Sequence, residues 1–118
     1  MADPSSQQDR TKVDLKNALS GKKLIAHCRS KDDDLGAQLV EEGTSFHWSF
    51  KTLLLGTTLY WCNLAVEDRR LSFTAYDEDD DEIRGYTVRW VVRDDGAHLV
   101  LRSDHEEEPI ARQKWRRI

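Results

Sequence analysis

Cysteine, proline and glycine are scarce in this sequence, and long apolar runs are absent. Of its 118 residues, two are cysteine, two are proline and six are glycine. No apolar stretch approaches the roughly 20 residues that a membrane-spanning helix needs. The formal net charge is −4, whereas domains that bind nucleic acid carry a basic excess. We therefore expect no direct membrane insertion and no nucleic-acid partner.

Motifs that would indicate catalysis are also missing. The four histidines fall in separate predicted elements, and none accompanies a serine or cysteine in a recognisable nucleophile motif. His27 directly precedes Cys28, but neighbouring residues of a strand point to opposite faces of a sheet. No glycine-rich phosphate loop occurs. We expect no enzymatic activity, no cofactor and no metal.

Short segments of alternating apolar residues recur along the chain, at the spacing typical of an all-β protein. In the clearest segment, Phe46, Trp48 and Phe50 alternate with His47 and Ser49. Other strands are predicted over residues 13–16, 24–29, 57–64, 71–75, 86–93, 97–101 and about 110–117. The prediction is an antiparallel β-sandwich of about seven to eight strands, joined by hydrophilic loops.

The chain is short enough that we expect a single domain. Residues 1–11 are polar and unpatterned, so they are predicted to form a flexible tail before a domain at 12–118. Residues 35–42 are the only candidate helix. Because Gly36 and Gly43 interrupt that segment, the preferred prediction there is an ordered loop.

The two cysteines, Cys28 and Cys62, fall in predicted strands of apolar character. They are open to three interpretations: a disulfide, two buried thiols, or a metal site completed by His27 and His47. Zinc sites usually show a short Cys-x-x-Cys or His-x₃-His spacing, which is missing here. The disulfide is therefore favoured, with a stabilisation of roughly 3–4 kcal/mol in the chain-entropy model.

Two acidic runs are candidates for binding a partner. The longer run consists of Asp77, Glu78, Asp79, Asp80, Asp81 and Glu82. Adjacent carboxylates repel one another, so this run must be exposed to solvent. It is open to interpretation as a solvated loop that prevents aggregation, as a recognition loop for a basic partner, or as a calcium site that lacks the EF-hand glycine. The shorter run, Asp32 and Asp33 followed by Asp34, has similar interpretations.

Two longer motifs point to a family. Residues 28–36 read CRSKDDDLG, and residues 58–62 read TLYWC. Around them lie the aromatic stripe at 46–50, Trp90, the Asp95-Gly96 turn and Trp115. This combination, which spans roughly residues 13–117, resembles the plant self-incompatibility S-protein family, also called the S-protein homologues.

The resemblance implies a small secreted plant protein with a β-sandwich fold and hydrophilic loops that carry recognition. The founding members are stigma ligands that reject self pollen by binding a pollen membrane receptor. Cys28 and Cys62 match the cysteine pair that the family shares, whereas a second pair found in some members is absent here. Residues 1–8 have no charged n-region and no apolar stretch, which fits either a cytosolic protein or a secreted one that has lost its signal peptide. The cysteine pair and the resemblance favour the second, so we expect a signal peptide to have been removed.

The hypothesis from the sequence is a secreted, monomeric, non-enzymatic signalling ligand with a plant membrane receptor as its partner. The acidic runs are its candidate contact residues. The alternative from another class is a secreted hydrolase or nuclease on a β-sandwich scaffold. That alternative requires a concave pocket in which two ionisable side chains converge.

Overall fold

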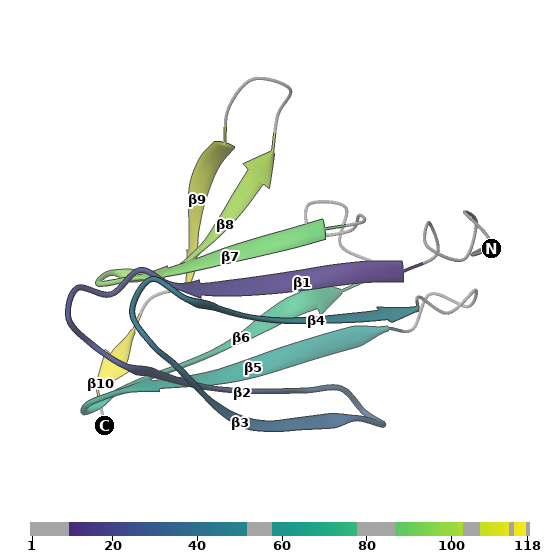
Figure 1. Ribbon diagram of the computed structural model, residues 1–118, viewed down its shortest axis with the longest axis horizontal. Coiled ribbons are helices and arrows are strands. Elements are labelled where there is room, and N and C mark those ends of the chain that lie inside the picture. The colour runs from purple at the N-terminus through teal and green to yellow at the C-terminus, as the bar shows by residue number, and fades with distance from the viewer. Residues whose placement is uncertain (1–9, 52–57, 78–86, 103–106, 114, 118) are drawn as a thin grey trace.

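The computed structural model describes residues 10–51, 58–77, 87–102, 107–113 and 115–117. Within these ranges the chain is built from strands and turns, without a helix. The described part of the chain accordingly contains no helix long and apolar enough to cross a membrane. Figure 1 shows two packed layers of strands, so the predicted all-β sandwich is confirmed.

The first sheet, here called sheet 1, contains five strands in the order β4-β1-β7-β8-β9. Its strands are β1 (Arg10–Asn17), β4 (Ser45–Lys51), β7 (Thr87–Arg93), β8 (Gly96–Arg102) and β9 (Glu107–Gln113). The pair β1–β7 is parallel, whereas the other pairs of this sheet are antiparallel. A parallel pair was not predicted, because pairing between strands so far apart in sequence leaves no periodic signal.

The second sheet, sheet 2, has the order β10-β6-β5-β2-β3 and is antiparallel throughout. Its strands are β2 (Leu24–Arg29), β3 (Asp34–Val40), β5 (Leu59–Val66), β6 (Arg69–Asp77) and β10 (Arg116–Arg117). The described ranges thus contain ten strands, more than the predicted seven to eight. The predicted last strand is divided into β9 and β10, and β1 begins at Arg10, before the expected domain start at residue 12.

The element β3 corrects the prediction of an ordered loop, and of a candidate helix, over residues 35–42. Its residues pair with β2 from Leu24 opposite Val40 to His27 opposite Ala37 and, after a register shift, again at Arg29 opposite Asp34. Gly36 takes a positive φ of 77°, which glycine adopts at little cost. The strand lies at the edge of the sheet and buries only Val40 fully, so its apolar alternation is too weak to read from the sequence.

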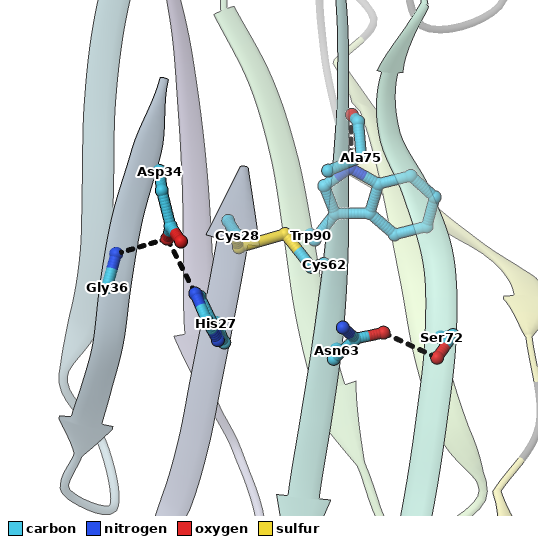
Figure 2. Close-up of a disulfide and its surroundings, with 9 residues drawn as sticks. All are labelled: His27, Cys28, Asp34, Gly36, Cys62, Asn63, Ser72, Ala75 and Trp90. Carbon is cyan, nitrogen blue, oxygen red and sulfur yellow. Dashed lines mark hydrogen bonds and ion pairs between the residues drawn. A yellow bond between two sulfur atoms is a disulfide. The ribbon is translucent and has the colours of Figure 1, made fainter. Parts of the chain in front are cut away.

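The core lies between the two sheets and is filled by alternate residues of each strand. Trp90 of β7 is buried, and its ring packs edge-on against Phe73 of β6 at a centroid distance of 4.6 Å. Its indole Nε1–H donates to the backbone oxygen of Ala75 at 2.9 Å (Figure 2). The register of β6 shifts between Tyr76 and Thr74, so Ala75 sits in a β-bulge. The bulge frees a carbonyl that the indole satisfies, and this bond joins the two sheets.

The predicted disulfide is present between Cys28 of β2 and Cys62 of β5, with a Cα–Cα distance of 4.0 Å (Figure 2). The two residues are register partners in adjacent strands, and both are fully buried. The interpretations as free thiols or as metal ligands are therefore wrong for these cysteines. Because the bridge lies within sheet 2, it ties neighbouring strands together rather than the two layers.

Asn17, the last residue of β1, is a buried polar residue with 0% exposure. Its side-chain Nδ2 donates to the backbone oxygens of Lys22 and Val40, at 2.8 and 2.9 Å, and its Oδ1 accepts from the backbone N–H of Leu19 at 2.8 Å. Its own carbonyl accepts from the N–H of Gly43 at 2.8 Å. One side chain thus holds the β1–β2 connection and the end of β3 together, and a buried amide satisfied in this way is stabilising.

Candidate functional site

Several segments come together at the end of the sandwich where β2, β4 and β6 finish and β5 begins. Residues 30–33 form the turn between β2 and β3, and they face residues 50–51 and 58–61 across a groove of about 580 Å³. The register fixes this arrangement, because Arg29 lies opposite Trp61 and Leu59 lies opposite Asp77. We call this cavity the end groove.

Aromatic packing below the end groove gives it a rigid apolar base. Phe50 stacks on Tyr60 with ring centroids 4.7 Å apart and meets Tyr76 at 5.0 Å. Tyr60 is buried, and this burial raises the pKa of its hydroxyl above the ordinary value. Leu59 remains 37% exposed. The groove therefore combines an apolar base with charged residues at its rim.

The disulfide fixes the distance between the two walls of the end groove. Residues 30–33 begin two positions after Cys28, and residues 58–61 end immediately before Cys62. Both walls are therefore short extensions of the two bridged strands. A covalent link this close leaves the walls little freedom to separate while the bridge is intact.

The turn that carries Asp32 and Asp33 is closed by its own hydrogen bonds. The backbone N–H of Ser30 donates to the carbonyl of Asp33 at 2.7 Å, and the N–H of Asp33 donates to the Ser30 hydroxyl at 3.1 Å. The side chains of Asp32 and Asp33 are exposed. The turn thus holds two carboxylates at the rim of the groove, as a site for a basic partner requires.

Asp34 anchors this turn to the sheet (Figure 2). Its Oδ1 accepts from the backbone N–H of Gly36 at 2.9 Å and from His27 Nε2 at 2.6 Å. The Gly36 bond, followed by the His27 bond, lowers the pKa of the Asp34 carboxyl below its ordinary value. Asp34 therefore serves the structure, whereas Asp32 and Asp33 are the members of the run that line the end groove.

The longer acidic run lies almost entirely outside the described residues. Only Asp77, the last residue of β6, is described, and it has an interaction partner. Asp77 and Thr87, which flank residues 78–86, both lie at the end of the sandwich that carries the end groove. The candidates Glu78–Glu82 stay predictions.

Sequence reasoning missed the contribution of β4 and β5 to this end. Lys51, Leu59 and Trp61 line the end groove, and the Arg29 guanidinium lies 5.8 Å from the centre of the Trp61 ring. The motif at residues 58–62 was recognised for its family resemblance alone. Its alternation would have placed Leu59 and Trp61 on one face, but their exposure depends on the tertiary packing.

A second histidine–carboxylate pair lies at the opposite end of the molecule. His98 Nε2 is 2.6 Å from Asp95 Oδ1, and this bond lowers the pKa of Asp95 below its ordinary value. Among the residues that the structure describes, no three His, Cys, Asp or Glu side chains are grouped to hold a metal ion. The two histidine pairs are thus separate features of different turns.

Comparison with known proteins places the chain in a family. Residues 12–115 match the family described as plant self-incompatibility protein S1. S-protein homolog 3 of Arabidopsis thaliana is 33% identical over 89 residues, which cover 72% of this chain and 59% of that protein. S-protein homolog 21 of the same plant is 34% identical over 97 residues, which cover 76% of this chain and 73% of that protein. The match thus spans about three fifths of the first relative's length.

A solved structure supports the same fold. It aligns with a TM-score of 0.70 over 92% of this chain and 96% of the other, at 22% identity. That structure is of SPH (self-incompatibility protein homologue) proteins, described as a widespread family of small, highly stable, secreted proteins from plants. With the family match over residues 12–115, the resemblance inferred from the sequence is confirmed: this chain belongs to the plant self-incompatibility S1 family, the S-protein homologues.

Proposed function

We propose that the protein is a secreted, non-enzymatic signalling ligand that binds a plant membrane receptor through the end groove and its flanking loops. Pollen rejection or another form of cell-to-cell signalling is the process it serves. The observation that carries this proposal is the groove itself, where exposed Asp32 and Asp33 stand beside the partly exposed Leu59 and Trp61. Apolar contact with a charged rim is the usual anatomy of a protein-binding site.

Secretion is supported by the disulfide and by the relatives. Disulfides persist in oxidising compartments and are rare in the cytosol, and the bridge between Cys28 and Cys62 is buried. The SPH structure is of proteins described as secreted. We infer that this chain follows the same route after loss of a signal peptide.

Recognition in this proposal works by complementary charge on a preformed surface. The bridged walls present the carboxylates of Asp32 and Asp33 in a closed turn, so little conformational entropy is lost when a partner binds.

A hydrolytic function gains no comparable support. His27 and His98 each pair with an aspartate, but in the described ranges no serine hydroxyl is hydrogen-bonded to either ring. Neither histidine lines the end groove. A nucleophile, a base and a cavity must coincide for that chemistry, so we assign these pairs to the support of turns.

The test is a binding experiment with the oxidised protein on plant membrane extracts, followed by association kinetics on the captured receptor. An Asp32→Asn/Asp33→Asn variant should associate about fivefold more slowly at low salt, because rim charges act mainly on the association rate. The difference should shrink at high salt. A variant with Asp77–Glu82 replaced by Ser and Asn tests the longer run in the same way.

A matched control removes two charges at the other end of the sandwich. Glu41→Gln/Glu42→Gln changes the net charge equally in the exposed β3–β4 connection and should leave association unchanged. Equal slowing by both double variants would show a general charge effect and overturn the end groove as the contact site. Hydrolysis of a membrane or wall substrate by the purified protein would overturn the ligand proposal itself.

A further inference from the structure

The charged side chains described on the outward face of β1, β4 and β7 in sheet 1 are mostly basic, although the whole chain has a net charge of −4. Alternate residues of β1, β4 and β7 point away from the core. The charged residues among them are Lys12, Asp14, Lys16, Lys51, Arg89 and Arg93. One carboxylate thus stands among five cationic side chains.

The acidic residues are concentrated elsewhere, in the connections between strands. Each of four short connections carries two adjacent carboxylates. These pairs are Asp32 and Asp33, Glu41 and Glu42, Glu67 and Asp68, and Asp94 and Asp95. The fold therefore separates charge, with acids at both ends of the sandwich and bases on one broad face. A face of this kind attracts anions despite the negative net charge.

The basic face contains a hollow of about 350 Å³, near the lower limit for ligand pockets. Its charged lining comes from Asp14 and Lys16 of β1 and from Arg89 and Arg93 of β7. Asp14 lies opposite Arg89 in the parallel register. Val91 and Val100 supply apolar surface. We call this cavity the face hollow.

The side chains of the face hollow define the chemistry of its ligand. Lysine and arginine only donate hydrogen bonds, whereas an ionised aspartate only accepts them. Arg89 already has an interaction partner, but the Lys16 ammonium and the Arg93 guanidinium form no hydrogen bond or ion pair with another described side chain. A fitting ligand is anionic, to meet Lys16 and Arg93, and carries hydroxyl groups that donate to Asp14.

Other polyanions fit the face hollow less well. It lies over β1 and β7, two inner strands whose backbone groups are engaged in pairing on both sides, so a peptide cannot add as a strand. No aromatic side chain lines it in the described part of the chain, so bases have no stacking platform. Among the residues whose side chains are described, the exposed large apolar ones, Ile25, Leu39 and Leu59, belong to sheet 2 and do not line the face hollow. The described surface there therefore gives a membrane no apolar anchor.

We propose that the face hollow binds an acidic saccharide, a sugar that carries carboxylate or sulfate groups together with free hydroxyls. The anionic groups pair with Lys16 and Arg93, and the hydroxyls donate to Asp14. Small aliphatic side chains contact the sugar ring. The site lies on a different surface from the end groove, and it does not depend on the receptor-binding proposal.

The test is a titration of the oxidised protein with trigalacturonate at low salt, followed by calorimetry or by NMR shifts of the β1 and β7 amides. The wild type should bind trigalacturonate and should show no binding to neutral maltotriose. The exposed double variant Lys16→Gln/Arg93→Gln should raise the Kd about tenfold, since two charge-assisted contacts are lost. Titration with the galacturonate monomer tells the two sources of the ligand apart. A site for a free sugar acid binds the monomer, whereas a site for a polymer requires the trimer.

Two controls make the result decisive. Lys23→Gln/Arg70→Gln removes the same charge from exposed positions outside the face hollow and the end groove and should change the Kd less than about twofold. Asp14→Ala should reduce the preference for trigalacturonate over triglutamate, which has no hydroxyls. Three results would each overturn the proposal: no binding by the wild type, an equal loss of affinity in Lys16→Gln/Arg93→Gln and in the control double variant, or equal affinity of the wild type for triglutamate. Tighter binding to anionic vesicles than to trigalacturonate would also overturn it.

Discussion

Two polar sites at opposite ends of the sandwich, Asn17 and the turn of Asp32 and Asp33, use their side chains in opposite ways. At the end where β1 finishes, Asn17 is fully buried, and its side chain makes three hydrogen bonds to the backbone. At the other end, Asp32 and Asp33 are exposed around the end groove, and their turn is closed by Ser30 and by the backbone. Asn17 thus satisfies its polar groups within the protein, whereas Asp32 and Asp33 leave their charges to solvent.

The difference separates stability from recognition within one small domain. A buried, satisfied amide adds stability and offers nothing to a partner. Exposed carboxylates in solvent add little stability, but they steer association. The disulfide lies in strands that lead into the end groove, so it supports the exposed end from within. Variants at the two ends should therefore change different measured quantities.

The largest effect should follow removal of the disulfide. Cys28→Ala/Cys62→Ala, or reduction of the wild type, should lower the free energy of unfolding by roughly 3–4 kcal/mol and the Tm by about ten degrees or more. Differential scanning calorimetry measures both. A reduced protein that melts together with the oxidised one would show that the bridge adds no stability.

The next effect should come from the buried end. Asn17→Ala leaves two carbonyls and one N–H without partners and should cost about 3 kcal/mol, measured by urea unfolding. The control Asn63→Ala removes a half-buried amide whose Oδ1 accepts from the Ser72 hydroxyl at 2.6 Å, and it should cost less than about 1 kcal/mol. Similar losses in both variants would contradict the structural role of Asn17.

The smallest effect should be a change in acid sensitivity near the end groove. The pKa of Asp34 is lowered from its ordinary value of 3.8, so its folded-state pKa lies below its unfolded one. Its stabilisation is present above that ordinary value and is lost as the pH falls through the folded value. Below about pH 4, the Tm of the Asp34→Asn variant should therefore fall less steeply than that of the wild type. Asp95 should keep its own contribution in both proteins. Identical acid profiles for both proteins would argue against the His27 and Gly36 bonds.

The sequence predicted strands where one face is apolar and packs against the core. Phe46, Trp48 and Phe50 showed the period of two because one side of β4 faces the core. Strand β3 was missed because its edge position leaves most of its residues partly exposed and because Gly36 suggests a break. The parallel pairing of β1 with β7 depends on contacts across more than 70 residues, which no local pattern records.

The sites were predictable only in part. The pairing of Cys28 with Cys62 was favoured correctly by spacing, and Asp32 and Asp33 do lie at the rim of a cavity. The wall formed by Lys51 and Trp61 arises where separate strands meet, so only the tertiary structure reveals it. The basic face was hidden for a related reason, because the net charge of −4 sums over groups that the fold separates.

The position of β1 has a consequence for the order of folding. In sheet 1 this strand lies between β4 and β7 and pairs with both. During synthesis from the N-terminus, β1 therefore lacks its second partner, β7, until residues 87–93 have been made. The bridged strands of sheet 2 close over a separation of 34 residues, and contacts that are nearer in sequence form earlier. The half of the sandwich that begins the chain is thus completed only after residues 87–93 have joined it.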